Sequence, residues 1–369
     1  MPIRKIAHLT SVHPRYDTRI FLKMCTSLAN DPKYKVYLLV ADDLPYEEKN
    51  GVTIVSVGKT TGGRLSRMTR TVGRVYKKAM ELDCDLYHFH DPELMPIGVK
   101  LKKRGKKVIY DVHEDARQQI MLKGYIPAIL RKALSCIYAR YEDYACRQFA
   151  ALITPQEIMS QYYQKIKMTV TVENFVDLSL YPERKLDFTK PILLHAGALS
   201  DDRGLYNMVN AAKFLKGDFL FYVAGRLDGH VSPVSLSPLI YLGFLDPKSL
   251  VDAYRKSNIG VILYNNVGQY WMAGAVKCYE YMANSMPVLM PDFGEWVDFN
   301  RVHQCGINVD VQNAQSIAEA IHYLIDNPEK ASELGRNGRR WVEERYSWQS
   351  AFRKLQSLYG QLLETPVSL

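Results

Sequence analysis

The chain has 369 residues, 47% of them hydrophobic and 24% charged, so its length predicts about two domains and its composition excludes intrinsic disorder. No run approaches the roughly 20 apolar residues of a membrane-spanning helix, and the apolar run at the start is too short for a signal peptide. Six cysteines without a CxxC pair argue against a zinc ribbon or a disulfide framework. We therefore expect a cytoplasmic protein.

The first half of the chain alternates strands with helices, which is the pattern of βαβ units around a parallel sheet. It predicts helices at 20–29, 64–82, 94–103 and 126–149. Strands are predicted at 3–10, 34–40, 52–57, 86–90, 107–112, 151–154 and 169–172.

A second series follows the polar segment 173–182. It predicts strands at 192–196, 219–224, 239–242, 259–263 and 288–290, with helices at 205–214, 247–256, 277–284 and 314–327. The fold class is therefore α/β, with two consecutive doubly wound domains of the Rossmann-like type joined near residue 175.

Candidate site residues in the first domain follow its strands, because open parallel sheets bind ligands beyond the carboxyl ends of their strands. This places His90, His113 and Glu114 at one edge. His88 and His90 lie two residues apart on one strand, so they share a face, and a histidine there can bind a sugar hydroxyl or a phosphate. The alternative is a polar strand end satisfied by neighbouring backbone. A metal held by His88, His90 and His113 lacks a matched further ligand, and we expect none.

Candidate residues in the second domain suit a diphosphate. Gly197 and Gly225 follow strands, and Arg203 precedes a helix, where backbone N–H groups and a guanidinium can bind phosphate oxygens. Lys277 and Glu280 lie one helical turn apart on one face, so the carboxylate can accept ribose hydroxyls while the ammonium neutralises a phosphate. A strand–turn–helix with a solvated arginine, and an isolated salt bridge, are the structural alternatives.

Several motifs together make the chain resemble the retaining glycosyltransferases of family 4, which have the GT-B fold, and most closely the bacterial members that build capsule and O-antigen polysaccharides. The order and spacing of these motifs carry the resemblance: SVHPRYDTRIFLKMCTSLA, YHFHDPELMPIGVKLKKRGKKVIYDVHED, ENFVDLSLYP, LLHAGALSDDRGL, YLGFLDPKSLVDAYRKSNIGVIL, KCYEYMANSMPVL and GRNGRRWVEERYSW.

The resemblance implies a role for each matched position. His90 is the cleft histidine beside the donor sugar, Glu280 binds the ribose, and Arg203 and Lys277 bind the donor diphosphate. His90, Arg203 and Lys277 are thus the implied catalytic residues, with Gly197 and Gly225 also on the donor side. The implied acceptor side comprises Asp17, Arg19, His113 and Glu114.

The implied architecture has an interdomain cleft. An acceptor-binding domain covers 1–175 together with a helix at 346–369 that crosses back, and a nucleotide-sugar domain covers 176–345.

Three departures from the family pattern bear on the donor. The first of two family glutamates is Met272, the arginine usual after Gly197 is Ala198, and the first loop has Pro14 and Tyr16 in place of paired glycines. These changes leave the donor sugar unassigned. They also keep open a non-catalytic GT-B module that binds a partner glycosyltransferase.

The implied activity is hexosyl transfer with retention of anomeric configuration, without a metal or a cofactor. The donor is a nucleoside diphosphate sugar, UDP- or GDP-linked, and the acceptor a saccharide or a lipid-diphosphate-linked saccharide. A nicotinamide oxidoreductase is the rival enzyme class, but the first turn contains no GxGxxG.

The basic residues predict a peripheral location at the inner face of the plasma membrane. Residues 1–180 carry 29 Lys and Arg against 19 Asp and Glu. The predicted helix 64–82 combines basic residues with an apolar stripe of Leu65, Met68, Val72, Val75 and Ala79, and Lys100–Lys107 forms a second basic cluster. Such surfaces attract anionic lipid. Aromatic residues do not interleave with these charges, so nucleic-acid binding is not expected.

Overall fold

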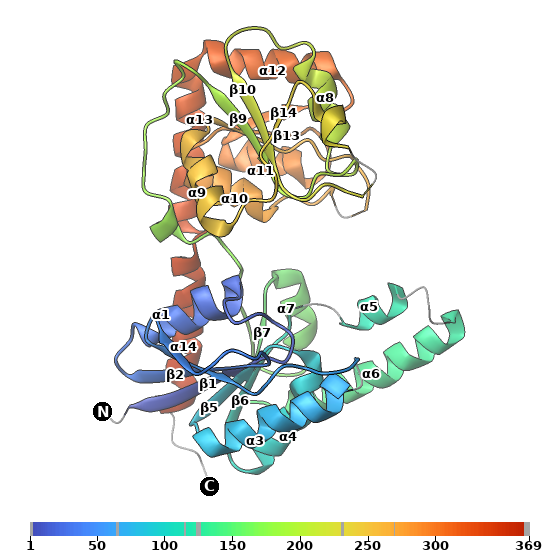
Figure 1. Ribbon diagram of the computed structural model, residues 1–369, viewed down its shortest axis with the longest axis vertical. Coiled ribbons are helices and arrows are strands. Elements are labelled where there is room, and N and C mark those ends of the chain that lie inside the picture. Colours follow the sequence, from blue (N-terminus) through green and yellow to red (C-terminus); the bar gives the residue numbers. More distant parts are fainter. Residues whose placement is uncertain are drawn as a thin grey trace. The chain divides into compact units, whose positions relative to one another are not determined.

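The computed structural model describes residues 3–63, 66–113, 116–122, 127–229, 232–268 and 270–364. The chain divides into two compact units (Figure 1). Unit 1 comprises Met1–Asn174 and Ala351–Leu369, and unit 2 comprises Phe175–Ser350. Each contains a sheet whose strands are parallel apart from one edge pairing in unit 1, which confirms the predicted α/β class.

Unit 1 is built on an eight-stranded sheet in the order β3-β4-β2-β1-β5-β6-β7-β8. Its edge strand β3 runs antiparallel to β4, and the remaining neighbours are parallel. The strands are β1 (Arg4–Leu9), β2 (Tyr34–Val40), β3 (Glu47–Lys49), β4 (Val52–Ser56), β5 (Leu86–Phe89), β6 (Lys107–Asp111), β7 (Ala151–Thr154) and β8 (Thr169–Thr171).

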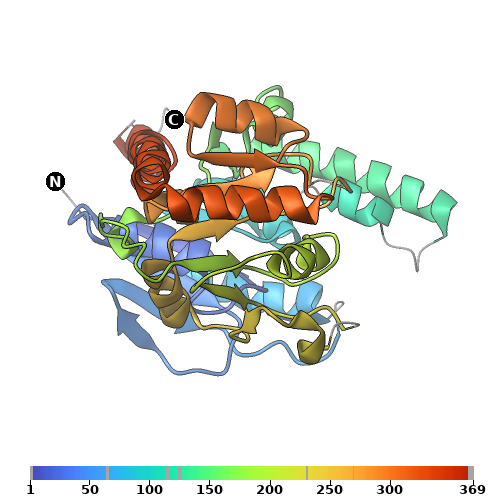
Figure 2. The same ribbon diagram turned by 90° about the horizontal axis from the view of Figure 1, so that it is seen from above.

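The helices of unit 1 cover both faces of this sheet. A π-helical segment, Thr18–Cys25, continues into α1 (Thr26–Ala29), and a second one, Arg67–Thr71, continues into α3 (Val72–Leu82). The others are α4 (Met95–Lys103), α5 (Ala116–Leu122), α6 (Ala128–Gln148), α7 (Glu157–Tyr163) and α14 (Trp348–Glu364). In both Figure 1 and Figure 2, α6 extends beyond the sheet of its own unit.

Alternation along β1 directs side chains to two different layers. Ala7 and Leu9 join the core beneath α3, α4 and α6, whereas His8 points to the opposite face, where it contacts Tyr359 of α14. The same alternation places Tyr87 and Phe89 in the core and His88 beside Tyr359. The face under α14 is therefore unusually polar.

Unit 2 has a six-stranded parallel sheet in the order β11-β10-β9-β12-β13-β14. Its strands are β9 (Ile192–Ala196), β10 (Leu220–Ala224), β11 (Ile240–Tyr241), β12 (Ile259–Val261), β13 (Val288–Pro291) and β14 (Gly306–Val309). Its helices are α8 (Leu205–Ala212), α9 (Pro247–Lys256), α10 (Val276–Ala283), α11 (Glu295–His303), α12 (Ala314–Asp326) and α13 (Pro328–Glu344). One apolar core lies under α8 and α12, the other under α9, α10 and α13.

One sequence interpretation needs correction. The apolar stripe expected to face lipid on the helix after residue 64 is largely internal, since Val72, Val75 and Ala79 are buried in the core of unit 1. Only Met68 among its described members is exposed. Arg64 and Leu65 lie outside the described residues. Among those that are described, no helix has the length and apolarity required to cross a membrane.

Candidate active site

The loop after β1 is fixed by two acidic partners. Arg15 is buried and donates two hydrogen bonds to Asp42 at 2.8 and 3.0 Å and one to Glu47 at 3.0 Å. These ion pairs hold the loop that has Pro14 and Tyr16 where glycines were expected. Asp17 caps the following helix by accepting from the backbone N–H groups of Arg19 and Ile20, each at 2.8 Å. Arg15 was not a predicted site residue.

Asp17 also binds His13, whose ring lies 3.4 Å from its carboxylate. Burial opposes ionisation of Asp17, but the hydrogen bonds from His13 and the backbone lower its pKa to about 2. Burial likewise opposes protonation of His13, but its hydrogen bond to Asp17 and the charge of Asp91 raise its pKa. The pair is therefore poised to carry opposite charges.

Asp111, at the end of β6, is the hub of the site in unit 1. Arg19 donates to both of its oxygens, at 3.0 and 3.1 Å, and the rings of His113 and His90 approach Oδ2 at 2.9 and 3.2 Å. Burial opposes ionisation, yet the charges of Arg19 and His113 hold the pKa of Asp111 well below its usual range. Arg19 was predicted to reach the acceptor, but here it is buried and holds Asp111.

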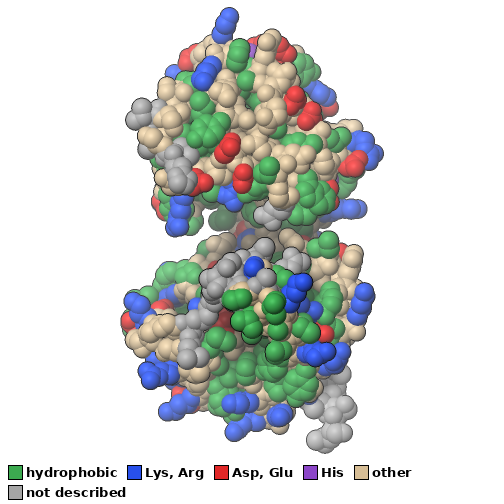
Figure 3. All heavy atoms as spheres, turned by 90° about the vertical axis from the view of Figure 1, so that its right-hand side faces the viewer, with side chains coloured by type: hydrophobic (Ala, Val, Ile, Leu, Met, Phe, Trp, Pro, Cys, Tyr) green, Lys and Arg blue, Asp and Glu red, His purple; other side chains and the backbone are tan. Residues whose placement is uncertain are grey.

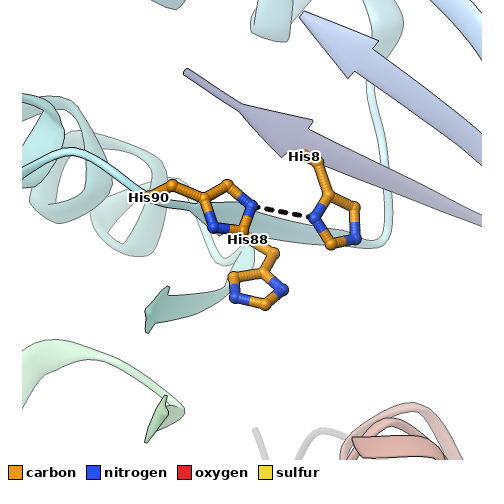
Figure 4. Close-up of side chains that lie close together, drawn as sticks. All are labelled: His8, His88 and His90. Atoms are coloured by element: carbon orange, nitrogen blue, oxygen red, sulfur yellow. Dashed lines mark hydrogen bonds between the residues drawn. The ribbon is translucent and has the colours of Figure 1, made fainter. Parts of the chain in front are cut away.

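Three histidines form a buried network beside this hub. His8 and His90 approach each other at 2.9 Å, and His88 packs against both rings (Figure 4). The hydroxyl of Tyr359, on α14, lies 2.7 Å from His88 Nδ1 and 3.2 Å from His8 Nε2. Burial lowers the pKa of His90 to about 4 and keeps the pKa values of His8 and His88 well below normal. All three rings are thus neutral at pH 7.

Each neutral ring donates from one nitrogen and accepts at the other. Because the Asp111 carboxylate can only accept, the hydrogen bonds that lead to it through these rings run in one direction. His88 Nδ1–H donates to Tyr359, Tyr359 O–H to His8 Nε2, His8 Nδ1–H to His90 Nε2, and His90 Nδ1–H to Asp111. Every donor in this series finds one acceptor, and His88 Nε2 is left over as an unpaired acceptor. Both nitrogens of His90 therefore bind protein groups, so His90 positions Asp111 and His113 and does not face the pocket through a free nitrogen.

Two groups in this region have the spacing of metal ligands. They are His8, His88 and His90, and His90, Asp111 and His113, with ligand atoms within 4.8 Å of one another. In the hydrogen-bond series each ring of the first group carries its proton on Nδ1, and Nε2 of His8 and of His90 accepts a hydrogen bond, so only His88 Nε2 keeps a free lone pair. In the second group, His90 Nδ1 and His113 Nε2 both face Oδ2 of Asp111 as donors.

A pocket of about 620 Å³ opens in front of these residues. Its polar lining includes His13, Asp91 and His113, and its apolar lining includes Met68 and Tyr141. Asp91 is buried and accepts from Thr10 and from the backbone N–H of Ser11, which fixes it at the end of β5. The pocket combines titratable groups with an apolar wall, as small-molecule sites do. Glu114, the remaining predicted acceptor residue, lies outside the described residues.

In unit 2, Gly197 and Gly225 end β9 and β10 with backbone angles that only glycine adopts readily, φ +146° and +148°. A Cβ on Gly225 would lie 1.8 Å from the carbonyl oxygen of Gly197. The two glycines line a pocket of about 210 Å³ together with Ala198, Arg226 and Phe244. Arg226 stacks on the exposed Phe244 ring at 4.8 Å. The sequence reasoning missed Arg226 and Phe244, although both closely follow predicted strands.

Lys277 reaches this glycine turn from the first turn of α10. A Cβ on Gly197 would lie 2.4 Å from its Nζ, so the ammonium occupies space that only glycine leaves open. His195, missed by sequence reasoning, donates from Nδ1 to the Val261 carbonyl and lies 3.3 Å from Lys277 Nζ. Burial, with the nearby charge of Arg203, lowers the pKa of Lys277 to about 7. Its described contacts, His195 and the Tyr264 ring, are not anions, and the nearby charge of Glu280 offsets only part of the lowering of the pKa.

Glu280 and Arg203 complete the donor side of unit 2. Glu280 accepts from the Tyr254 hydroxyl at 2.6 Å, and Arg203 donates to the Tyr270 hydroxyl at 3.1 Å. Gly204 begins α8 with φ +74°, where a Cβ would meet the Leu263 carbonyl. All five residues predicted for the donor side lie in unit 2. Gly197 and Gly225 directly follow β9 and β10, Arg203 precedes α8, and Lys277 and Glu280 lie on α10.

Comparisons with known proteins agree with this architecture. Residues 19–180 match the model described as Glycosyltransferase Family 4, and residues 182–341 match glycosyl transferases group 1. The sucrose-phosphate synthase of Thermosynechococcus elongatus superimposes with a TM-score of 0.69 at 17% identity, covering 98% of this chain and 99% of that one. HepE of Anabaena, solved with UDP and glucose, gives 0.67 at 12% identity, covering 97% and 100%.

Curated relatives match shorter parts of the chain at somewhat higher identity. The spore coat protein SA of Bacillus subtilis is 26% identical over 32% of this chain and 31% of its own length. The capsular polysaccharide biosynthesis glycosyltransferase CapM of Staphylococcus aureus is 25% identical over 47% of each. The D-rhamnosyltransferase WbpZ of Pseudomonas aeruginosa is 21% identical over 74% of this chain and 72% of its own length. The matches thus span less than half the length of the spore coat protein and of CapM.

The fold defines the structural class of the protein, which is the GT-B type. Within that class, two glycosyltransferase family models match consecutive parts of the chain, Family 4 in the first half and group 1 in the second.

Proposed function

We propose that the chain transfers a hexosyl group from a nucleoside diphosphate sugar, UDP- or GDP-linked, to a saccharide or lipid-diphosphate-linked acceptor, with retention, in the synthesis of a cell-surface polysaccharide. The names of CapM and WbpZ support the polysaccharide context. The UDP and glucose bound to HepE support the donor class.

One observation carries the donor assignment: the ammonium of Lys277 is buried against Gly197, and its described contacts, His195 and the Tyr264 ring, carry no negative charge. Burying a cation is costly, and the pKa of Lys277 is lowered although the nearby charge of Glu280 raises it. A diphosphate at the glycine turn would supply a negative charge in direct contact. Arg203 and the backbone N–H groups that begin α8 would stabilise the charge that develops on the leaving group.

The rest of the mechanism follows from which groups remain available. The Glu280 carboxylate, oriented by Tyr254, would accept hydrogen bonds from the ribose hydroxyls. The pocket lined by Phe244 would hold the nucleobase. The departing phosphate would take the proton of the acceptor hydroxyl, so no protein carboxylate has to act as base. On the acceptor side, His13 and His113 face the pocket of unit 1, with Asp17, Arg19 and His90 positioning them.

The first test is thermal unfolding of the full chain with millimolar UDP, GDP, ADP and dTDP in turn. A nucleotide at a hundred times its Kd stabilises the native state by about 2.7 kcal/mol, so the donor nucleotide should raise the midpoint. The same nucleotide-sugar should then yield a product whose anomeric configuration, read by NMR, matches the donor. Absence of any shift with all four nucleotides would favour the non-catalytic module.

A further inference from the structure

Helix α6 has one face that belongs to the core of unit 1. Ala145 and Cys146 are buried, and Tyr138 packs against the same core. Glu142 is buried as well and accepts from Arg117 at 2.7 Å. These residues recur at helical spacing, so they fix which side of α6 looks inward.

The face of α6 next to this inward side is apolar and exposed. Its members alternate four and three residues apart, a spacing that forms one continuous stripe on a helix. Leu130, Ile137 and Tyr144 are exposed by 54%, 64% and 48%. Figure 3 shows hydrophobic side chains gathered on one face of unit 1 with Lys and Arg around them. The stripe comprises Leu130, Leu134, Ile137, Tyr141 and Tyr144.

The charges beside the stripe are cationic. Arg140 and Arg147 are exposed three or four residues from Ile137 and Tyr144, so they adjoin the stripe, whereas Lys132 is exposed on the other side of α6. Both carboxylates of the helix, Glu142 and Asp143, are instead engaged with Arg117, at 2.7 and 2.6 Å. The free face of α6 is therefore an apolar stripe bordered by positive charge.

We propose that the α6 stripe docks on an anionic lipid bilayer, with its apolar side chains in the interfacial layer and Arg140 and Arg147 on the headgroups. Such a helix lies in the membrane plane and gains from both apolar burial and charge attraction. A second copy of the chain fits less well, because a symmetric α6 pair would bring the cationic flanks together while the helix's own carboxylates are occupied by Arg117.

Docking through α6 would also bring the acceptor pocket to the lipid. Tyr141 belongs both to the stripe and to the lining of the pocket that contains His13 and His113. A lipid-linked acceptor could then enter from the bilayer along the α6 stripe. This consequence rests on the proposed function, whereas membrane docking itself does not.

Co-sedimentation of the full chain with vesicles of phosphatidylglycerol and phosphatidylcholine tests the docking without any donor or acceptor. Leu130→Asp/Ile137→Asp is expected to lower the partition coefficient more than about ten-fold, since two apolar side chains are then kept out of the interfacial layer. Arg140→Ala and Arg147→Ala should each lower it about five-fold, and Lys132→Ala, on the other side of α6, should lower it less. Val302→Asp, at an equally exposed site on α11 of unit 2, is the matched control and should bind like the wild type.

A fluorescent label tests insertion directly. The other five cysteines are buried, and only Cys136 is exposed. In Cys136→Ala/Ile137→Cys, an environment-sensitive probe on residue 137 should shift to shorter wavelength with anionic vesicles. The same probe in Cys136→Ala/Val302→Cys should stay unchanged.

Three outcomes would overturn the proposal: wild-type protein that ignores anionic vesicles, binding that is unaffected by the α6 variants, or a dimer that depends on Leu130 and Ile137 in the absence of lipid. Binding through α6 without sugar transfer would leave the docking intact and count against the proposed function. Transfer to a water-soluble acceptor without vesicle binding would do the reverse.

Discussion

The candidate sites of the two units treat buried polar groups in opposite ways. In unit 1, the series from His88 to Asp111 leaves a single histidine acceptor unpaired, and its charged end is neutralised by Arg19. In unit 2, Lys277 is buried in contact with His195 and the Tyr264 ring, and its pKa is lowered to about 7 although the charge of Glu280 raises it. The hydrogen-bonded network of unit 1 fixes the positions of its side chains before any ligand binds. In unit 2, the buried ammonium has no anion among its described contacts, which makes the surroundings of Lys277 the better candidate for the ligand site.

Breaking the hydrogen-bonded network of unit 1 at its hub should have the largest effect. Asp111→Ala leaves Arg19 buried without its carboxylate, and we expect the free energy of unfolding to fall by about 3–5 kcal/mol. Chemical denaturation measures this change. Asp85→Ala is the control, because Asp85 also pairs with an arginine, Arg4, but at the surface, where the loss should stay within about 1 kcal/mol. Equal losses in the two variants would show that the network does not depend on Asp111.

Removing the charge of Lys277 should lower the affinity for the donor nucleotide more than it lowers the free energy of unfolding. Lys277→Met is expected to lower the affinity for the donor nucleotide about ten- to hundred-fold, since a hydrogen bond to a charged group contributes about 1.5–3 kcal/mol. Isothermal titration calorimetry measures the affinity. Lys248→Met is the control, because Lys248 is exposed on α9 of the same unit. If Lys277→Met binds nucleotide as tightly as the wild type, the diphosphate does not lie at the glycine turn.

The sequence predicted most of the strands and helices of both units, but not the side-chain contacts that distinguish their two candidate sites. Strands β2, β7 and β9 have the predicted limits, because apolar runs bounded by polar residues mark them locally. Strand β14 and helix α11 were missed. Tyr359 and His8 are 351 positions apart in the sequence, so no local sequence pattern predicts their contact. Likewise, His195 was visible in its motif, but its support of Lys277 depends on how β9 faces α10.

The lowered pKa of Lys277 predicts how nucleotide binding depends on pH. Because the ligand-free pKa is about 7, the ammonium is mostly neutral above that value, and a diphosphate binds the protonated form. Affinity should therefore fall about ten-fold per pH unit from pH 7 upward, until the pKa of the complex is reached. Titrations between about pH 7 and 9 measure this slope. Lys277→Arg stays charged and should flatten it. A flat wild-type profile would mean that Lys277 is not the group that meets the phosphate.

The smallest expected effect tests whether α14 controls the histidines. Tyr359→Phe removes the hydroxyl that accepts from His88 and donates to His8, and it should cost about 1 kcal/mol, the net contribution of a hydrogen bond. Tyr34→Phe is the control, because Tyr34 packs edge-on against Tyr359 and is only half-buried.

A purely structural role of Tyr359 would change stability alone. If the hydroxyl fixes the tautomers, the ring-nitrogen NMR signals of His8 and His88 should shift in Tyr359→Phe and stay in place in Tyr34→Phe. His90 would then lose the ordered donor on its Nε2, because the orientation of His8 is set from α14. Unchanged signals in both variants would show that the series is ordered from Asp111 alone and that the last helix contributes packing only.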